Sequence, residues 1–290
     1  MRSMYKIIYL LTALAAFGQD TRVILLGTGT PNPEPVRIGP AVAIVSGERV
    51  YIVDSGPGVV RRAAEAGIAM KQITRAFITH LHSDHTAGLP DLILTPAVTG
   101  RMEPLTIYGP PGIRAMTRNI MKAYQQDINI RLHGMEPAVA AAYRVEGRDG
   151  KPGEIYHDDA MRVEAIAVKH GTWKHAYGYR FSAKDKIIVV SGDATYSESL
   201  MAASRGADIL VHEVYSEKGL RQRTADWRRY HAAFHTSGPD VGRLAAQAGV
   251  KKLVLYHQLL MGETAEQVLN EVKTGFHGEV IYGKDLDVIR

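Results

Sequence analysis

One short stretch, His80-Leu81-His82-Ser83-Asp84-His85, constrains the fold more than any other feature, because it places four side chains of metal-binding type within six residues. It follows an apolar segment, residues 76–79, whose pattern predicts a β-strand. Imidazole and carboxylate groups are costly to crowd together unless a positive charge compensates them, and a cation would compensate all four. The sequence therefore predicts a metal site where this strand ends.

The spacing divides these four side chains into two sets. In an extended chain the first two histidines point to the same side and can bind one metal ion. The aspartate and the last histidine lie on the next turn and can bind a second. Each metal ion then needs ligands from elsewhere, and three candidates follow other predicted strands: His170, Asp193 and His257. A carboxylate offers two oxygens, so Asp193 can bridge two metal ions. Four isolated histidines are interpreted as surface or core residues: His133, His157, His175 and His277.

Apolar strand patterns alternate with helical patterns along the chain. The predicted strands cover residues 22–26, 41–45, 50–53, 76–79, 105–108, 163–168, 177–182, 186–190, 208–212 and 252–256. The predicted helices cover residues 89–99, 112–123, 197–204, 239–248 and 264–274, with one more after Gly58. Residues 134–157 lack periodicity and are interpreted as irregular. Strands that occur singly and in hairpins between helices favour a layered α/β fold, an αββα sandwich with two sheets face to face and helices outside.

The first 18 residues differ in kind from the rest of the chain. Arg2 and Lys6 give a basic start, and residues 7–17 form an apolar run that ends beside Gly18. This pattern predicts a signal peptide over residues 1–18, a mature domain over residues 19–290, and a periplasmic or secreted protein. The run of about 11 apolar residues falls short of the roughly 20 that cross a bilayer, so no membrane partner is expected.

Composition and charge exclude several functions. The chain has no cysteine, which rules out a thiolate nucleophile, a Cys-ligated zinc ion, an iron–sulfur cluster and a lipoprotein anchor. The net charge of +5 falls to +3 without Arg2 and Lys6, because 33 basic residues then face 30 acidic ones, and this is too small to indicate nucleic-acid binding. One basic cluster is interpreted as a solvated helix face, with an anionic substrate as the alternative partner: Arg221, Arg223, Arg228 and Arg229.

The complete pattern is His-x-His-x-Asp-His, then a single His, a Gly-Asp pair and a final His, each after a predicted strand. It resembles the signature of the metallo-β-lactamase superfamily across nearly the whole mature chain. The resemblance implies one zinc ion bound by His80, His82 and His170. It implies a second zinc ion bound by Asp84, His85 and His257, with Asp193 bridging the two. Asp54 matches an aspartate that supports the metal-binding loop without binding metal itself. Three neutral imidazoles on the first metal suit zinc, while Mn²⁺ and Fe²⁺ are left open.

Other residues resemble the ribonuclease Z and arylsulfatase-like branch of this superfamily, namely His212-Glu213, His235-Thr236-Ser237 and residues 177–180. The resemblance implies that His235, oriented by Glu213, acts near the leaving group, where it can protonate the departing oxygen. Asp84 is expected to serve the attacking water, and His231 is expected to matter less than His235.

Some features depart from ribonuclease Z. Glu213 is followed by Val-Tyr where Ala-Thr is usual, and Asp193 is followed by Ala194 where Thr is usual. Residues 134–157 are short for the long arm that grips tRNA. Together with the expected leader, these departures disfavour tRNA 3′-processing.

We therefore expect an exported binuclear zinc hydrolase in which a metal-bridged hydroxide attacks an anionic ester. A sulfate ester (arylsulfatase-like activity) or a phosphodiester is the favoured substrate. Arg37 or the 221–229 cluster is available to the anionic group. The expected partner is a small-molecule anionic ester rather than nucleic acid, and a homodimer is left open. The alternatives are a lactone or β-lactam hydrolase on the same metal site, a non-catalytic metal-bound binding protein and a diiron redox protein. A tRNA 3′-processing endonuclease is less favoured.

Overall fold

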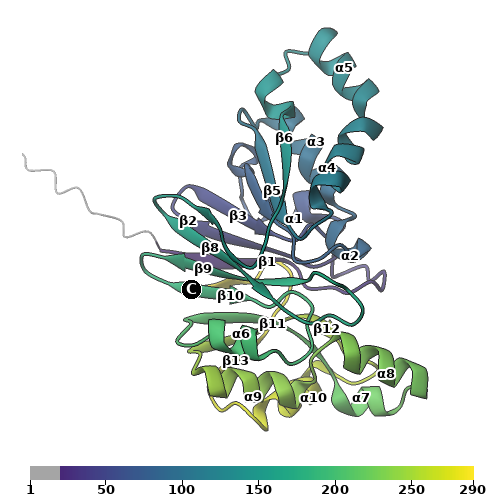
Figure 1. Ribbon diagram of the computed structural model, residues 1–290, viewed down its shortest axis with the longest axis vertical. Helices are drawn as coiled ribbons and strands as arrows, with labels where there is room; N and C mark the ends of the chain where they lie inside the picture. Colours follow the sequence, from purple (N-terminus) through teal and green to yellow (C-terminus); the bar gives the residue numbers. More distant parts are fainter. Residues whose placement is uncertain (1–19) are drawn as a thin grey trace, which may run out of the picture.

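The computed structural model describes residues 20–290 and has the layered architecture that the sequence predicts. Two seven-stranded sheets pack face to face, and helices cover their outer surfaces (Figure 1). The fold is thus an αββα sandwich. The leader expected at residues 1–18 lies outside the described residues. Among residues 20–290, none of the helices combines the length and apolar character that crossing a bilayer requires.

The first sheet has the strand order β14-β1-β2-β3-β4-β5-β6. Its strands are β1 (Arg22–Gly27), β2 (Ala41–Ser46), β3 (Arg49–Val53), β4 (Arg75–Phe77), β5 (Leu105–Gly109), β6 (Val145–Asp149) and β14 (Val288–Ile289). The helices that accompany it are α1 (Val59–Glu65), α2 (Ser83–Thr86), α3 (Leu89–Thr99), α4 (Ile113–Ala123) and α5 (Gln125–His133), with short 3-10 turns at Met70–Gln72 and Ala140–Tyr143. Strands β14 to β3 pair antiparallel and β3 to β6 pair parallel.

The second sheet has the order β13-β12-β11-β10-β9-β8-β7. Its strands are β7 (Gly153–His157), β8 (Met161–Ala167), β9 (Tyr177–Ala183), β10 (Ile187–Val190), β11 (Ile209–Tyr215), β12 (Lys252–Leu259) and β13 (Glu279–Tyr282). Its helices are α6 (Glu198–Ala203), α7 (Glu217–Arg221), α8 (Ala225–Phe234), α9 (Gly238–Ala248) and α10 (Ala265–Lys273). The chain reaches β14 last, so the C-terminal strand pairs with β1 and completes the first sheet.

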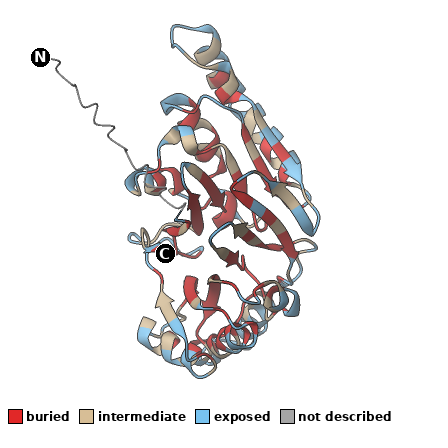
Figure 2. Cartoon of the chain, turned by 90° about the vertical axis from the view of Figure 1, so that its left-hand side faces the viewer, coloured by how far each residue is buried: buried red, intermediate tan, exposed pale blue. Residues whose placement is uncertain are grey.

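Three apolar layers hold the sandwich together. The middle layer lies between the sheets and is rich in aromatic residues: the Phe77 ring stacks on Tyr108 at a centroid distance of 5.2 Å and meets Phe181 edge to face at 5.5 Å. The outer layers pack each sheet against its own helices. Buried residues are accordingly concentrated in the strands (Figure 2). The central parallel strands β11 and β12 are covered on both faces, which explains why they have nearly continuous apolar sequences.

The expectation for residues 134–157 is wrong, because this region contains β6 and β7 rather than irregular chain. Both strands lie at sheet edges and are largely exposed, with Gly147 the one buried residue between them. An edge strand tolerates charge on its exposed positions, so the apolar alternation that normally signals a strand is missing.

The loop that follows β4 is fixed by close backbone contacts. The N–H of Gly88 donates to the carbonyl of Ser55 and the N–H of Ser55 donates to the carbonyl of His85, both at 2.8 Å. A Cβ on Gly56 would lie 2.3 Å from the carbonyl carbon of Gly39, and one on Gly88 would lie 2.3 Å from the carbonyl oxygen of Gly56. Only glycine fits where these segments cross.

We expect Gly56→Ala to lower the free energy of unfolding by about 1–3 kcal/mol, because the added methyl group forces the crossing segments apart. Gly150→Ala is the matched control, since a Cβ there meets its neighbours at 3.4 Å. Its effect should stay within about 0.5 kcal/mol. Urea unfolding followed by circular dichroism measures both, and equal stability of the two variants would contradict this account of the loop.

Candidate metal centre

Eight side chains of metal-binding type meet at one end of the sandwich, where loops from both sheets converge. One is His235, which forms a potential metal-binding group with Asp193 and His257. The others are the seven that the sequence predicts as metal ligands: His80, His82, Asp84, His85, His170, Asp193 and His257. The first four follow β4 directly, with Asp84 and His85 on the short helix α2. The other three come from the second sheet. None of the four isolated histidines belongs to a potential metal-binding group among the described residues.

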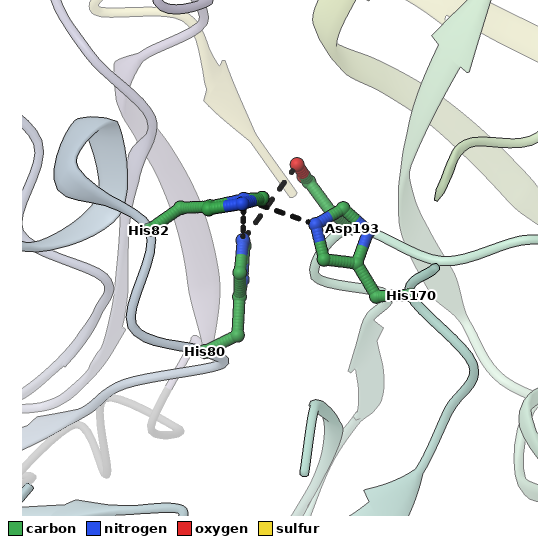
Figure 3. A group of neighbouring side chains, drawn as sticks. All are labelled: His80, His82, His170 and Asp193. Atoms are coloured by element: carbon green, nitrogen blue, oxygen red, sulfur yellow. Dashed lines mark hydrogen bonds and ion pairs between the residues drawn. The ribbon is translucent and has the colours of Figure 1, made fainter. Parts of the chain in front are cut away.

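The first group contains three histidines and Asp193. The Nε2 atoms of His80 and His170 each lie 3.0 Å from Nδ1 of His82 (Figure 3). Asp193 approaches the same point, with Oδ2 at 3.9 Å from Nε2 of His80. Hydrogen bonds alone do not explain three ring nitrogens that converge on one another, whereas a cation accepts a lone pair from each.

The second group contains Asp84, His85 and His257. Oδ2 of Asp84 lies 3.2 Å from Nε2 of His257 and 3.6 Å from Nε2 of His85. Asp193 also faces this group, since Oδ1 is 3.4 Å from His85 Nε2 and Oδ2 is 3.5 Å from His257 Nε2. The Asp193 carboxylate therefore lies between the two groups.

Unsatisfied buried atoms indicate that the site suits cations. Nε2 of His85 and Oδ1 of Asp193 are buried and accept or donate no hydrogen bond within residues 20–290. A buried carboxylate oxygen without a partner is destabilising unless positive charge compensates it. The donor set of imidazoles and carboxylates is the one that zinc and similar divalent cations prefer.

Protonation states favour metal binding in the first group. In the second group burial acts to lower the pKa values of His85 and His257, but the charge of Asp193 outweighs it and raises them, so a cation must displace protons there. Burial lowers the pKa of His80 well below its usual value and that of His170 to about 4, so both rings are neutral near pH 7 and keep a free lone pair. Burial acts to raise the pKa of Asp193, but the charges of His257 and His85 outweigh it and hold the pKa well below its usual value. Asp193 is thus an anion.

Neighbouring groups fix the orientation of the histidines. Asp54 accepts a 2.8 Å hydrogen bond from the backbone N–H of Thr79 through Oδ1, and its Oδ2 lies 2.8 Å from Nδ1 of His85. Nδ1 of His170 lies 2.7 Å from the carbonyl oxygen of Phe234, so it is the protonated nitrogen and leaves Nε2 as the free donor atom. Asp54 therefore contacts the metal-binding loop in the way that the sequence predicts, through Thr79 and His85.

His257 departs from the expected position after a strand, because β12 continues through it to Leu259. Glu213 of β11 pairs with Tyr256 and Val214 pairs with Gln258, which leaves His257 as the extra residue of a β-bulge. Its φ of 45° lies in the left-handed region. Bulges redirect side chains at functional sites, and this one carries the imidazole into the metal-binding groups.

His235 and Glu213 form a buried pair beside the groups. Nδ1 of His235 lies 3.5 Å from Oε2 of Glu213 and 3.8 Å from Oδ2 of Asp193. Oε1 of Glu213 accepts a 2.7 Å hydrogen bond from the N–H of Thr236. Burial lowers the pKa of His235 to about 4, and burial together with Asp193 raises the pKa of Glu213 well above its usual value. Both His212 and Glu213 lie inside β11 rather than after it.

A cavity of about 360 Å³ opens onto these groups. Its wall includes His82, Asp84, Asp193, His235 and His257, together with three residues of α8 that the sequence interpretation missed or ranked low: Trp227, Tyr230 and His231. The spacing of these three residues places them on one face of a helix, and this pattern could have identified them from the sequence. Trp173 was also missed; its indole Nε1 lies 2.8 Å from Nε2 of His82.

The arginines that the sequence offers as binding sites for an anionic group differ in their surroundings. Arg37 pairs with Glu34 at 2.5 Å and donates to Gln258 at 2.6 Å, so its charge is already compensated. Arg221 and Arg229 pair with acidic neighbours on exposed helix surface, as the solvated-face interpretation predicts. Arg223 lines a cavity beside the metal-binding groups, as Arg37 and Glu34 do, but among residues 20–290 it has no acidic partner of its own.

Comparison with known proteins agrees with this geometry. Residues 49–258 match the family described as Beta-lactamase superfamily domain. Ribonuclease Z of Mycobacterium bovis (strain BCG / Pasteur 1173P2) is 30% identical over 269 residues, covering 91% of this chain and 96% of that protein. The metallo-β-lactamase fold protein YhfI from Bacillus subtilis superposes with a TM-score of 0.72 at 21% identity, over 93% of this chain and 99% of that one. The short form of human tRNase Z gives 0.67 at 24% identity, over 93% and 98%.

The chain belongs to the β-lactamase superfamily and is a metal-dependent hydrolase of the metallo-β-lactamase fold. The fold class and the family resemblance predicted from the histidine pattern are confirmed.

We expect Asp54→Asn to weaken metal binding by about 10- to 100-fold, because an amide cannot accept from both Thr79 and His85. Metal affinity is measured by competition with a chromogenic chelator, and circular dichroism checks that the variant is folded. Asp226→Asn, whose side chain is 85% exposed, is the control and should bind metal as the parent does. An unchanged affinity in Asp54→Asn would refute the supporting role.

Proposed function

We propose that this chain is a binuclear, metal-dependent phosphodiesterase. The single observation that carries the proposal is the position of Asp193, whose carboxylate faces both donor groups while His235 and Glu213 lie directly beside it. The sequence relatives named ribonuclease Z support phosphodiester over sulfate ester, because a ribonuclease cleaves phosphodiester bonds. The arylsulfatase-like activity becomes the alternative.

In this proposal His80, His82 and His170 hold one divalent cation. Asp84, His85 and His257 hold the other, and Asp193 binds both. Zinc is the favoured metal because neutral imidazoles predominate in the first group. When bound, the two cations supply a water molecule of lowered pKa and neutralise negative charge on the phosphate.

The remaining chemistry falls to the chain's own residues. Asp84 lies at the cavity wall, where its carboxylate accepts a hydrogen bond from the attacking water and orients it. His235 lines the same cavity and holds the leaving oxygen. His235 donates its ring proton to that oxygen, and Glu213, whose Oε2 lies 3.5 Å from Nδ1, holds the imidazole in the orientation that the transfer needs.

Substrate class is tested with a panel: methyl 4-nitrophenyl phosphate, 4-nitrophenyl sulfate, a lactone and a β-lactam. We expect the phosphodiester to be turned over fastest by the zinc-loaded protein, and activity to be lost on chelation and restored by zinc. Initial rates and metal content are measured on the same sample. A lactone or β-lactam that is hydrolysed faster, or hydrolysis of the sulfate alone, would overturn the proposal.

The proton donor is tested with two leaving groups. In His235→Ala we expect kcat/KM to fall by about 10²- to 10⁴-fold for a phosphodiester with a phenolate leaving group. The loss should be smaller for 4-nitrophenolate, which departs without a proton. Glu213→Gln should show the same pattern, whereas the exposed residue His277 gives a control variant, His277→Ala, with parental rates. An equal loss for both leaving groups would exclude proton donation by His235.

Ribonuclease Z activity on precursor tRNA is a second candidate, favoured by relatives of 34% identity over 82% of this chain. It conflicts with the export that the first 18 residues predict. We propose that the protein is exported and acts on a small ester, and N-terminal sequencing of the protein purified from cells separates the two functions. A mature chain that begins near residue 19 supports export; an intact leader in the cytosolic fraction, with cleavage of precursor tRNA, favours the second candidate.

A further inference from the structure

The cavity at the metal-binding groups continues into a larger one. This outer cavity has a volume of about 530 Å³. Both cavities are lined by Asn32, Trp227, His231 and Leu259, so together they form one groove that leads outward from the metal centre. A substrate longer than the phosphate itself must extend along this groove.

One wall of the groove is an aromatic face of α8. Trp227, Tyr230, His231 and Phe234 follow the i, i+3, i+4, i+7 spacing that places side chains on one helix face. No residue of α8 is buried, and Trp227 is 55% exposed. An apolar helix face normally covers the core, so an aromatic face left open beside the metal centre indicates a binding surface.

The wall is held in a fixed geometry. The rings of Trp227 and His231 lie nearly parallel at 5.5 Å, and Tyr230 stacks on Phe234 at 4.3 Å. Phe234 in turn occupies the space beside Gly171, where a Cβ would lie 2.1 Å from its ring. The helix is thereby anchored at its C-terminal end while Trp227 presents its ring to the groove.

A positive charge lines the same outer cavity as this ring. Arg223 lines the outer cavity, with Nη2 3.8 Å from the position of a Cβ on Gly262. Within residues 20–290 its guanidinium forms no ion pair, in contrast to Arg37, whose charge is compensated by Glu34. An exposed indole and an uncompensated guanidinium in one cavity suit a ligand that has a flat ring and a separate anionic group.

We propose that the outer groove is a subsite for a nucleotide: its base stacks on Trp227 and a second phosphate binds Arg223, while the first phosphate lies at the metal centre. The inference rests on the proposed phosphodiesterase activity and names its substrate class as a nucleotide-containing ester. Ring stacking gives affinity without requiring a particular base, because every base has an aromatic face.

The test compares three probes on the zinc-loaded protein by isothermal titration calorimetry: ribose 5-phosphate, adenosine 5′-monophosphate and adenosine 3′,5′-bisphosphate. We expect the base to improve affinity on the order of tenfold and the second phosphate to improve it again. Trp227→Ala should remove the first gain and Trp227→Phe should retain most of it, whereas Arg223→Gln should remove only the second.

Arg229→Gln and Tyr124→Ala are the controls, since both side chains are exposed and lie outside the groove. They should bind all three probes as the parent does, and circular dichroism confirms that every variant is folded. If the parent hydrolyses methyl 4-nitrophenyl phosphate but binds all three probes equally, or if Trp227→Ala keeps the gain from the base, the subsite is refuted. If the parent hydrolyses no phosphodiester, the proposed function itself fails.

Discussion

Compensation of buried charge at the junction of the two sheets is the constraint on which the rest of the structure depends. The Asp193 carboxylate is buried among imidazoles, and the nearest of its contacts, 3.4 Å from His85, is not a hydrogen bond. Four of the seven predicted ligands come from the loop after β4 and three from the second sheet, so neither half of the chain can complete the set alone. Cations that bind here would therefore stabilise the folded chain as well as equip it for hydrolysis.

Sequence patterns predicted the site more completely than the fold. Local spacing defines the His80 to His85 stretch, and parallel strands carry their carboxyl ends to one edge, so the seven proposed ligands were found without a structure. The bulge at His257 was not predicted, because register between β11 and β12 depends on contacts between distant segments. Strands β6 and β7 were missed since exposed edges lack the apolar alternation on which prediction relies. The role of α8 as a wall of the cavity was missed because a sequence pattern can show that residues share one helix face, but it does not show which part of the protein that face contacts.

The departures from ribonuclease Z are accommodated by the structure around them. Ala194 follows Asp193, and its carbonyl oxygen accepts a 2.6 Å hydrogen bond from Oγ1 of Thr236. This contact ties the loop that carries Asp193 to the segment after α8, next to Glu213 and His235. Because the backbone carbonyl of Ala194 makes this contact, the contact does not depend on the side chain at position 194.

The pairing of β14 with β1 affects the order in which the molecule is built during translation. Strand β1 is among the first to be synthesised, yet its outer neighbour is not made until residues 288–289. Throughout synthesis of the intervening chain, the backbone amide and carbonyl groups along that side of β1 have no strand to pair with. Such an edge can recruit strands from other chains, so the nascent protein is exposed to misassembly until its last strand is available.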